Sequence, residues 1–267
     1  MVRDLRADDV GLVADLERLD QLHRGRRLER VAGGHAGVRW PIDLAPLFAS
    51  IGVERDYSDL DLSGFTLDLQ GWGADRPVFG RLLAEVRPEV VVEVGTWKGA
   101  SLVRMHGIAR ELGLDCQFIC VDTWLGSAEQ WLGAKDRARL RLTGGYPDLF
   151  RQFVYNLVAS DATDVFPLPM ASVGAATVLR ELGVRADLVY IDGGHSELDV
   201  ATDLTSYHPL LTEDGVLFGD DYAPGCDGVV RSVDRFVREH GLELEIDGPV
   251  WIARGAQRAD ASEGARP

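Results

Sequence analysis

Residues 187–222 read DLVYIDGGHSELDVATDLTSYHPLLTEDGVLFGDDY, and this stretch decides the fold. Two short apolar runs, Leu188–Ile191 and Val216–Phe218, are rich in β-branched or aromatic residues, and glycines lie close to both. Runs of this kind are typical of buried parallel strands. The segment between them, Ser196–Leu211, has the length of a helix and starts with a residue that favours the N-cap position. The stretch therefore predicts a strand–helix–strand unit of an α/β protein.

Both apolar runs end in acidic residues, Asp192 after the first and Asp220 and Asp221 after the second. Ligands of open α/β sheets bind at the carboxyl ends of the strands. If the two strands are neighbours, the three carboxylates face one spot, where they repel one another and partly protonate unless a cation lies among them. All-oxygen ligands suit a hard cation such as Mg²⁺. Consecutive strand residues point to opposite faces, so Asp220 and Asp221 can bind one ion only if the chain bends there.

The composition is that of an ordinary globular chain, and its charge narrows the choice of partners. The 267 residues are 46% hydrophobic and 27% charged, enough for one large α/β domain with an N-terminal extension. The net charge of -15 argues against a nucleic-acid partner and an anionic membrane surface, and favours a cationic ligand such as a sulfonium or a metal ion. Three widely spaced cysteines form no disulfide or zinc pattern, so we expect a cytoplasmic protein. We expect neither a signal peptide nor a membrane span.

The first part of the chain predicts helices joined by loops. Asp8–Leu28 is amphipathic and predicts a packing or dimerisation helix through which the protein would form a homo-oligomer. Pro41–Ser50 predicts a short helix. Leu69–Asp75 is a turn rich in Gly and Trp, which we interpret as a tight turn anchored by a buried Trp72, in preference to a flap over a ligand. A helix follows at Pro77–Val86, with proline in its first turn.

The next segment has the pattern of a nucleotide-type ligand loop. Val90–Val94 predicts a buried strand, Glu93–Gly99 has the spacing acid-x-Gly-x-x-x-Gly, and Ala100–Leu112 predicts a helix. Glycines at such a turn let the backbone approach a ligand closely. A second strand, Gln117–Val121, ends at Asp122, the position from which an acid holds a ribose diol. The spacing is not Gly-x-Gly-x-x-Gly, so the dinucleotide fingerprint is absent.

The rest of the chain continues the alternation of strands and helices. Residues 125–146 are an irregular insertion, of the kind that forms substrate lids. The patterns then predict a helix at Pro147–Val158, an outer strand with two prolines at Val165–Met170, helices at Ser172–Leu182 and Cys226–His240, a hairpin of Leu242–Ile246 and Val250–Ala253, and a disordered tail after it.

From about Leu69 to Arg254 the chain resembles the class I S-adenosylmethionine-dependent methyltransferases. The resemblance rests on the loop Glu93–Gly99, the ribose acid Asp122 and the terminal hairpin. It implies an α/β fold, a seven-stranded Rossmann-like methyltransferase sheet with helices on both faces and an N-terminal helical extension. The implied domains are an extension of residues 1–68, a methyltransferase domain of residues 69–254 and a tail of residues 255–267.

Within this class, the acidic residues resemble those of the Mg²⁺-dependent macrocin O-methyltransferase family and, more distantly, of catechol O-methyltransferases. The resemblance implies that Asp192, Asp220 and Asp221 are the metal ligands. Catechol-type enzymes have a Lys base three residues after the first metal acid, where this chain has His195. In macrocin-type enzymes the metal acid is credited with that role. The catalytic base is therefore either His195 or Asp192.

The resemblance also implies a donor site and a class of acceptor. S-adenosylmethionine would be held by Glu93, Gly95, Thr96, Trp97, Gly99, Ser101, Asp122, Thr123, Ser172 and Asp192, with Ser172 at the adenine. The acceptor would be the hydroxyl of a small molecule, first a sugar of a secondary metabolite in antibiotic biosynthesis or of a glycolipid, and second a catechol-like phenol. The alternatives are a metal-independent methyltransferase and a protein of the same fold with a hydroxylase-associated or nucleotide-cofactor role.

Overall fold

A computed structural model describes residues 43–53, 56–162 and 164–255. The contacts of the chain divide it into two compact units, Met1–Gly52 and Val53–Pro267. The first contains the short helix α2 (Ala45–Ala49), which lies within the predicted helix Pro41–Ser50. The predicted helix Asp8–Leu28 and the tail after Gly255 lie outside the described residues. The domain boundaries at residues 68 and 254 stay predictions.

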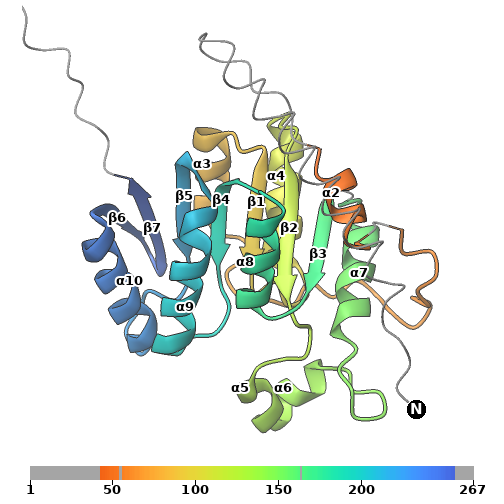
Figure 1. Ribbon diagram of the computed structural model, residues 1–267. Helices are drawn as coiled ribbons and strands as arrows, with labels where there is room; N and C mark the ends of the chain where they lie inside the picture. Colours follow the sequence, from red (N-terminus) through yellow and green to blue (C-terminus); the bar gives the residue numbers. More distant parts are fainter. Residues whose placement is uncertain (1–42, 54–55, 163, 256–267) are drawn as a thin grey trace, which may run out of the picture. The chain divides into compact units, whose positions relative to one another are not determined.

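The second unit is built on one seven-stranded sheet (Figure 1). The order is β3-β2-β1-β4-β5-β7-β6; the first five strands are parallel, and β7 runs antiparallel to both of its neighbours, β5 and β6. This confirms the predicted sheet and the place of the proline-containing strand at its edge. The strands are β1 (Val90–Val94), β2 (Gln117–Asp122), β3 (Val165–Pro169), β4 (Ala186–Ile191), β5 (Leu211–Gly219), β6 (Leu242–Asp247) and β7 (Val250–Gly255).

Helices cover both faces of the sheet, as predicted. In Figure 1, α8, α9 and α10 lie in front of the strands, and α3 and α4 lie behind them. Side chains of α3, α4 and α7 form one continuous core with those of the strands. Every residue of β1 and β4 is buried, which is why their sequences are nearly unbroken apolar runs. The helices of these layers are α3 (Pro77–Val86), α4 (Ala100–Glu111), α7 (Leu149–Ala159), α8 (Ser172–Glu181), α9 (Glu197–Tyr207) and α10 (Asp227–His240).

The helix between β4 and β5 is shorter than the sequence indicated. We expected it to reach Leu211, but α9 ends at Tyr207, a 3₁₀ turn spans His208–Leu210, and β5 already begins at Leu211. Pro209 lacks the backbone N–H that would continue the α-helical hydrogen bonds, so the helix stops there. At its start, Ser196 accepts a hydrogen bond from the Asp199 amide, which confirms the predicted N-cap.

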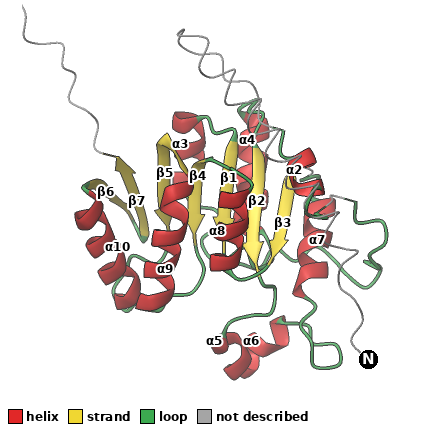
Figure 2. Ribbon diagram, in the orientation of Figure 1, coloured by secondary structure: helices red, strands yellow, loops and turns green. Residues whose placement is uncertain are grey.

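The insertion after β2 is more regular than predicted. It contains the helices α5 (Ala128–Leu132) and α6 (Ala134–Arg139) and a backbone bridge between Thr143 and Tyr146. Figure 2 shows both helices beyond the carboxyl ends of the parallel strands, the edge where α/β sheets bind ligands. Among the described residues, no helix has the length and apolar character needed to cross a bilayer.

Candidate functional site

The acidic ends of β4 and β5 lie side by side. The two strands are parallel neighbours, and Ile191 pairs with Gly219 at the end of the ladder. The Asp220 amide donates to the Ile191 carbonyl at 3.3 Å, so the backbone of Asp220 lies beside the start of the loop that carries Asp192. The tertiary structure therefore confirms the predicted adjacency of the two strand ends.

The chain bends between the two consecutive acids. Asp221 has a φ of 63°, in the left-handed region, which is uncommon for residues other than glycine but relatively frequent for Asp. Its amide donates to Oδ1 of Asp220 at 2.8 Å. This is the bend that the sequence required if both carboxyl groups were to approach one point.

Three side chains nevertheless converge in a different combination from the one expected. Asp192, His195 and Asp221 each offer one ligand atom, and these atoms lie within 4.8 Å of one another. The His195 Nε2 atom is 3.0 Å from Oδ2 of Asp221. Asp220 turns instead to Arg76, whose Nε and Nη2 atoms donate to its Oδ2 at 3.0 and 2.5 Å. Sequence reasoning missed Arg76, because nothing local marks a residue 144 positions away as a partner.

The electrostatics of this cluster favour a cation. Burial, followed by the charges of Asp220 and Asp221, raises the pKa of Asp192 to about 7. The hydrogen bond from His195 lowers the pKa of Asp221, and the same contact raises the pKa of His195. Three carboxyl groups thus lie close to one another, with the Arg76 guanidinium and the His195 imidazole as their neighbours. The donor set fits a divalent cation, which would remove the mutual repulsion of the carboxylates.

The glycine loop adjoins this cluster. Gly95, with a φ of 89°, lies so close to β4 that an added Cβ would be 2.1 Å from the Asp192 carbonyl oxygen. Gly99 has a φ of 82° and precedes α4 directly, and a Cβ there would be 3.0 Å from the Phe153 ring. Both positions require glycine, because positive φ and close contact exclude other residues. The loop Glu93–Gly99 and the acidic cluster therefore belong to one continuous site.

Glu93 supplies an observation that fits a polar ligand at the loop. Its side chain is fully buried, Oε1 accepts a hydrogen bond from the Ser101 hydroxyl, and Oε2 has no hydrogen-bond partner among the described residues. Burial raises the pKa of Glu93 to about 8. Buried polar atoms without partners are costly, and a ligand that supplies the missing bond removes that cost. The neighbouring Thr96 is also buried.

Asp122 is the last residue of β2 and lies against the glycine loop. Its Oδ2 accepts a hydrogen bond from the Trp97 amide and its Oδ1 one from the Trp124 amide, both at 2.7 Å. Burial raises the pKa of Asp122, and the amide bonds oppose that effect. The backbone amides of Thr96 and Thr123 also act on this carboxylate and lower its pKa, so the backbone of the two neighbouring loops fixes its orientation. The neighbouring Thr123 is exposed, and its hydroxyl accepts from the Leu125 amide at 3.2 Å.

Ser172 begins α8 and is tied to α9. Its carbonyl accepts a hydrogen bond from the Tyr207 hydroxyl at 2.8 Å, and its side chain bonds to Asp203. Asp203 is buried, which raises its pKa to about 6. A Cβ on Gly193 would lie 3.3 Å from Oδ2 of Asp203, so this acid lies beneath the loop between Asp192 and His195. The sequence did not single out Asp203.

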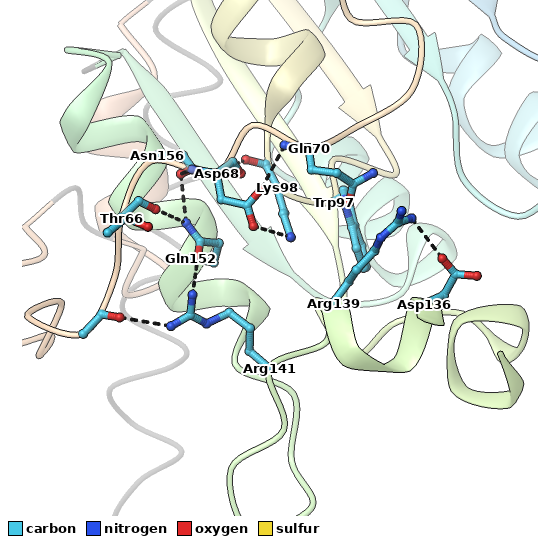
Figure 3. A network of polar contacts seen from close by, with 11 residues as sticks. Thr66, Asp68, Gln70, Trp97, Lys98, Asp136, Arg139, Arg141, Gln152 and Asn156 are labelled. Atoms are coloured by element: carbon cyan, nitrogen blue, oxygen red, sulfur yellow. Dashed lines mark hydrogen bonds and ion pairs between the residues drawn. The ribbon is translucent and has the colours of Figure 1, made fainter. Parts of the chain in front are cut away.

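A segment ahead of α3, residues 66–72, is fastened over the glycine loop by a polar network that sequence reasoning also missed (Figure 3). Lys98, only 2% exposed, pairs with Asp68 at 2.6 Å. Asn156 donates to the carbonyl oxygens of Asp68 and Lys98, each at 2.8 Å. Gln152 donates to the Thr66 carbonyl at 2.9 Å. The one available signal was a pair of amide side chains, four residues apart, on the predicted helix Pro147–Val158.

Trp72 in this segment faces the insertion after β2 rather than the core. It is 56% exposed, its ring lies 6.1 Å from that of Trp97, and the Arg139 guanidinium of α6 lies 5.5 Å from its centroid. The interpretation of Trp72 as a buried anchor is therefore wrong. The aromatic edge of Trp97 is held by Gln70, which accepts from its Nε1 at 3.3 Å (Figure 3).

Comparison with known proteins agrees with this architecture. A family described as a methyltransferase domain matches residues 92–222. The calicheamicin methyltransferase CalS11 has a similar structure, with 16% identity, 95% of this chain and 94% of that chain covered, and a TM-score of 0.51. A putative caffeoyl-CoA O-methyltransferase from Staphylococcus aureus is 12% identical, with 91% of this chain and 100% of that chain covered and a TM-score of 0.50.

A search of curated protein sequences finds no match to the chain. The family match spans both the glycine loop and the acidic cluster, and the sheet has the order of this fold. Together they place a methyltransferase domain at residues 92–222, on a sheet with the strand order of the class I S-adenosylmethionine-dependent methyltransferases.

Proposed function

We propose that this methyltransferase transfers a methyl group to a hydroxyl oxygen of a small molecule, with the help of a divalent cation. The observation that carries the proposal is the convergence of Asp192, His195 and Asp221 directly beside the glycine loop. A hydroxyl is a poor nucleophile at neutral pH. A bound cation would lower the pKa of the hydroxyl and orient it.

The residues of the loop would hold the donor. The backbone at Gly95 and Gly99 would approach the methionyl end, and Glu93 and Thr96 would lie beneath it. Asp122 would accept hydrogen bonds from the ribose hydroxyls, with Thr123 and Trp97 beside it. Ser101 orients Glu93, and Ser172 would contact the adenine. Asp192 touches both halves of the site, because its backbone meets Gly95 while its side chain belongs to the cluster.

The chemical step needs a base and an in-line approach. The hydroxyl oxygen forms a bond to the methyl carbon while the carbon–sulfur bond breaks, and the electron pair of that bond stays on sulfur as the thioether. The hydroxyl proton goes to Asp192 or His195, whose pKa values are both raised. A base with a pKa near neutrality is suited to this task. Holding donor and acceptor in line supplies the rest of the rate enhancement.

The acceptor and setting follow from the resemblance to macrocin O-methyltransferases. We propose a sugar hydroxyl of a secondary metabolite or glycolipid as acceptor, and a role in antibiotic biosynthesis. The three free cysteines support a reducing cytoplasm. Self-association through Asp8–Leu28 stays a prediction.

A single set of assays tests the proposal. Metal-stripped protein is incubated with S-adenosylmethionine carrying a labelled methyl group and panels of nucleotide sugars, glycosides and catechols, with a divalent cation or with EDTA. We expect labelled ether products that depend on the cation. Transfer that is indifferent to EDTA would establish the metal-independent alternative. Donor binding without transfer to any hydroxyl in the panels would favour the hydroxylase-associated alternative.

A further inference from the structure

The third protein ligand of the cation is the point at which this site departs from the expected arrangement of Asp192, Asp220 and Asp221. The atoms that share one small region belong to Asp192, His195 and Asp221, and not to Asp220. Two ligands at right angles, each about 2.1 Å from an ion, lie about 3 Å apart. The His195 Nε2 and Asp221 Oδ2 atoms form a hydrogen bond at 3.0 Å, and once its proton is lost both atoms are close enough together to reach one ion.

Both oxygens of Asp220 already accept hydrogen bonds. Its Oδ1 accepts from the Asp221 amide at 2.8 Å, and its Oδ2 accepts two hydrogen bonds from Arg76. The Asp220 side chain is 4% exposed and that of Arg76 is 25% exposed. Charge-assisted bonds to a guanidinium are among the strongest that a carboxylate makes. An ion at Asp220 would have to compete with the charge-assisted bonds of Arg76 for this carboxylate.

The position of Arg76 makes this pair part of the scaffold. Arg76 is the N-cap residue of α3, and Phe79 on the same helix packs in the core with rings on β4 and β5. Through its Oδ1, Asp220 in turn holds the amide of Asp221 in the left-handed bend. Asp220 therefore orients a neighbouring residue of the cluster while its own charge is neutralised by Arg76.

The resulting set of donors is chemically different from an all-carboxylate site. Two carboxylates and one imidazole nitrogen suit first-row transition ions, whereas Mg²⁺ prefers oxygen ligands alone. We propose that His195, rather than Asp220, is the third protein ligand, and that the cation of this enzyme is a first-row transition ion such as Mn²⁺ or Co²⁺ rather than Mg²⁺. This inference rests on the proposed function, because it concerns the cation of that same site. With Nε2 on the ion, the acceptor proton is left to Asp192.

Direct spectroscopy of the bound ion tests the assignment without any turnover. The full chain, stripped of metal, is loaded with Mn²⁺, and electron spin echo modulation is used to detect ¹⁴N coupled to the ion. We expect this coupling in the wild type and in Asp220→Asn, and its loss in His195→Gln. His240→Gln is the matched control, because His240 lies at the end of α10, where its Nδ1 atom is 2.9 Å from the Phe236 carbonyl oxygen and its ring contacts that of His208.

Metal titrations supply the second readout. Loss of a ligand in His195→Gln should weaken Mn²⁺ binding by at least about tenfold and leave Mg²⁺ binding nearly unchanged, which lowers the preference for Mn²⁺. Asp220→Asn should keep that preference. Thermal unfolding of each variant shows that the fold is retained, and Asp192→Asn provides a variant in which binding of both ions should fall.

Three results would overturn the inference. The first is that wild-type protein binds Mn²⁺ but shows no ¹⁴N coupling. The second is that Asp220→Asn loses metal binding while His195→Gln keeps it. The third is that the protein binds no divalent ion. The proposed function is judged separately, by donor binding and labelled methyl transfer. Cation-dependent transfer with Mg²⁺ through the three aspartates would keep that function and reject this inference.

Discussion

Gly95 and Asp192 touch across the ends of β1 and β4, and a Cβ added to Gly95 would be 2.1 Å from the Asp192 carbonyl oxygen. This contact joins the loop Glu93–Gly99 to the acidic cluster, so neither can shift without the other. If the loop holds the donor and the cluster holds the acceptor, as we propose, this backbone contact couples the two halves of the site.

Replacing Gly95 with Ala should therefore damage both stability and donor binding. The residue has a φ of 89°, which costs a non-glycine residue roughly 1–3 kcal/mol, and relief of the clash must move β4 or the loop. We expect a lower midpoint in urea unfolding and a weaker calorimetric affinity for S-adenosylmethionine. Gly107→Ala on α4 is the control, because nothing lies within 4 Å of its Cβ, and it should stabilise the protein by about 0.5–1 kcal/mol.

Removing the charge of Asp68 should release the segment of residues 66–72. Lys98 is 2% exposed and would lose its partner, and breaking a fully buried pair costs about 3–5 kcal/mol. Because the Asp68 side chain is 35% exposed, we expect the lower end of that range or less for Asp68→Asn. The affinity for S-adenosylmethionine should also fall in Asp68→Asn, because Lys98 belongs to the glycine loop.

A surface pair provides the comparison for this change. Arg110 and Asp161 are 2.8 Å apart with side chains 59% and 73% exposed, so Asp161→Asn should change the stability by less than about 1 kcal/mol. Both variants are compared by urea unfolding and by titration with S-adenosylmethionine. Equal effects of Asp68→Asn and Asp161→Asn would contradict the role given to the Lys98–Asp68 pair.

Asp203 should make the protein less stable as the pH rises from about 4 to about 6. Burial raises its pKa in the folded state from 3.8 to about 6, so the folded state binds more protons than the unfolded state within that window. The contribution of Asp203 to the free energy of unfolding is fully present below pH 4. It is lost as the pH rises through the pKa of the folded state, and the total loss is about 2–3 kcal/mol.

The variant Asp203→Asn isolates this contribution from the other acids. We expect the variant to have a higher free energy of unfolding than the wild type at pH 7. The difference between the two proteins should be smaller at pH 4, as measured by urea unfolding at each pH. The amide still offers an acceptor to Ser172, so the hydrogen bond can be kept. A difference between the two proteins that does not change with pH would refute the assignment.

Metal binding should release protons near neutral pH. Asp192 has a pKa of about 7 because burial and the nearby carboxylates disfavour its charge, and an ion binds only the ionised form. We expect calorimetric titrations in buffers of different ionisation enthalpy to give a release of roughly half a proton or more per ion at pH 7. Asp192→Asn should abolish this release along with tight binding, and metal affinity in the wild type should rise between pH 6 and pH 8.

Local sequence patterns predicted most of the strands and helices of the fold. The runs Val90–Val94 and Leu188–Ile191 are strands because continuous apolar residues can be buried on both faces of a parallel sheet. The helix Pro77–Val86 has the predicted bounds, with proline in the first turn. The insertion after β2 was the least predictable part, because its two helices of five and six residues are too short to show a periodicity.

The sequence by itself determined which residues stand at the strand ends, because the alternation of apolar runs, glycines and acids is a local property. It thus supplied Glu93, Gly95, Asp122, Asp192 and the Asp220–Asp221 pair as candidates, and the class of protein with them. Only the tertiary structure decided their partners. Arg76 reaches Asp220 across 144 residues, and Gln152 and Asn156 fasten residues 66–68 from another helix. Such pairings depend on how the elements pack in space, and the patterns that predict each element contain no information about that packing.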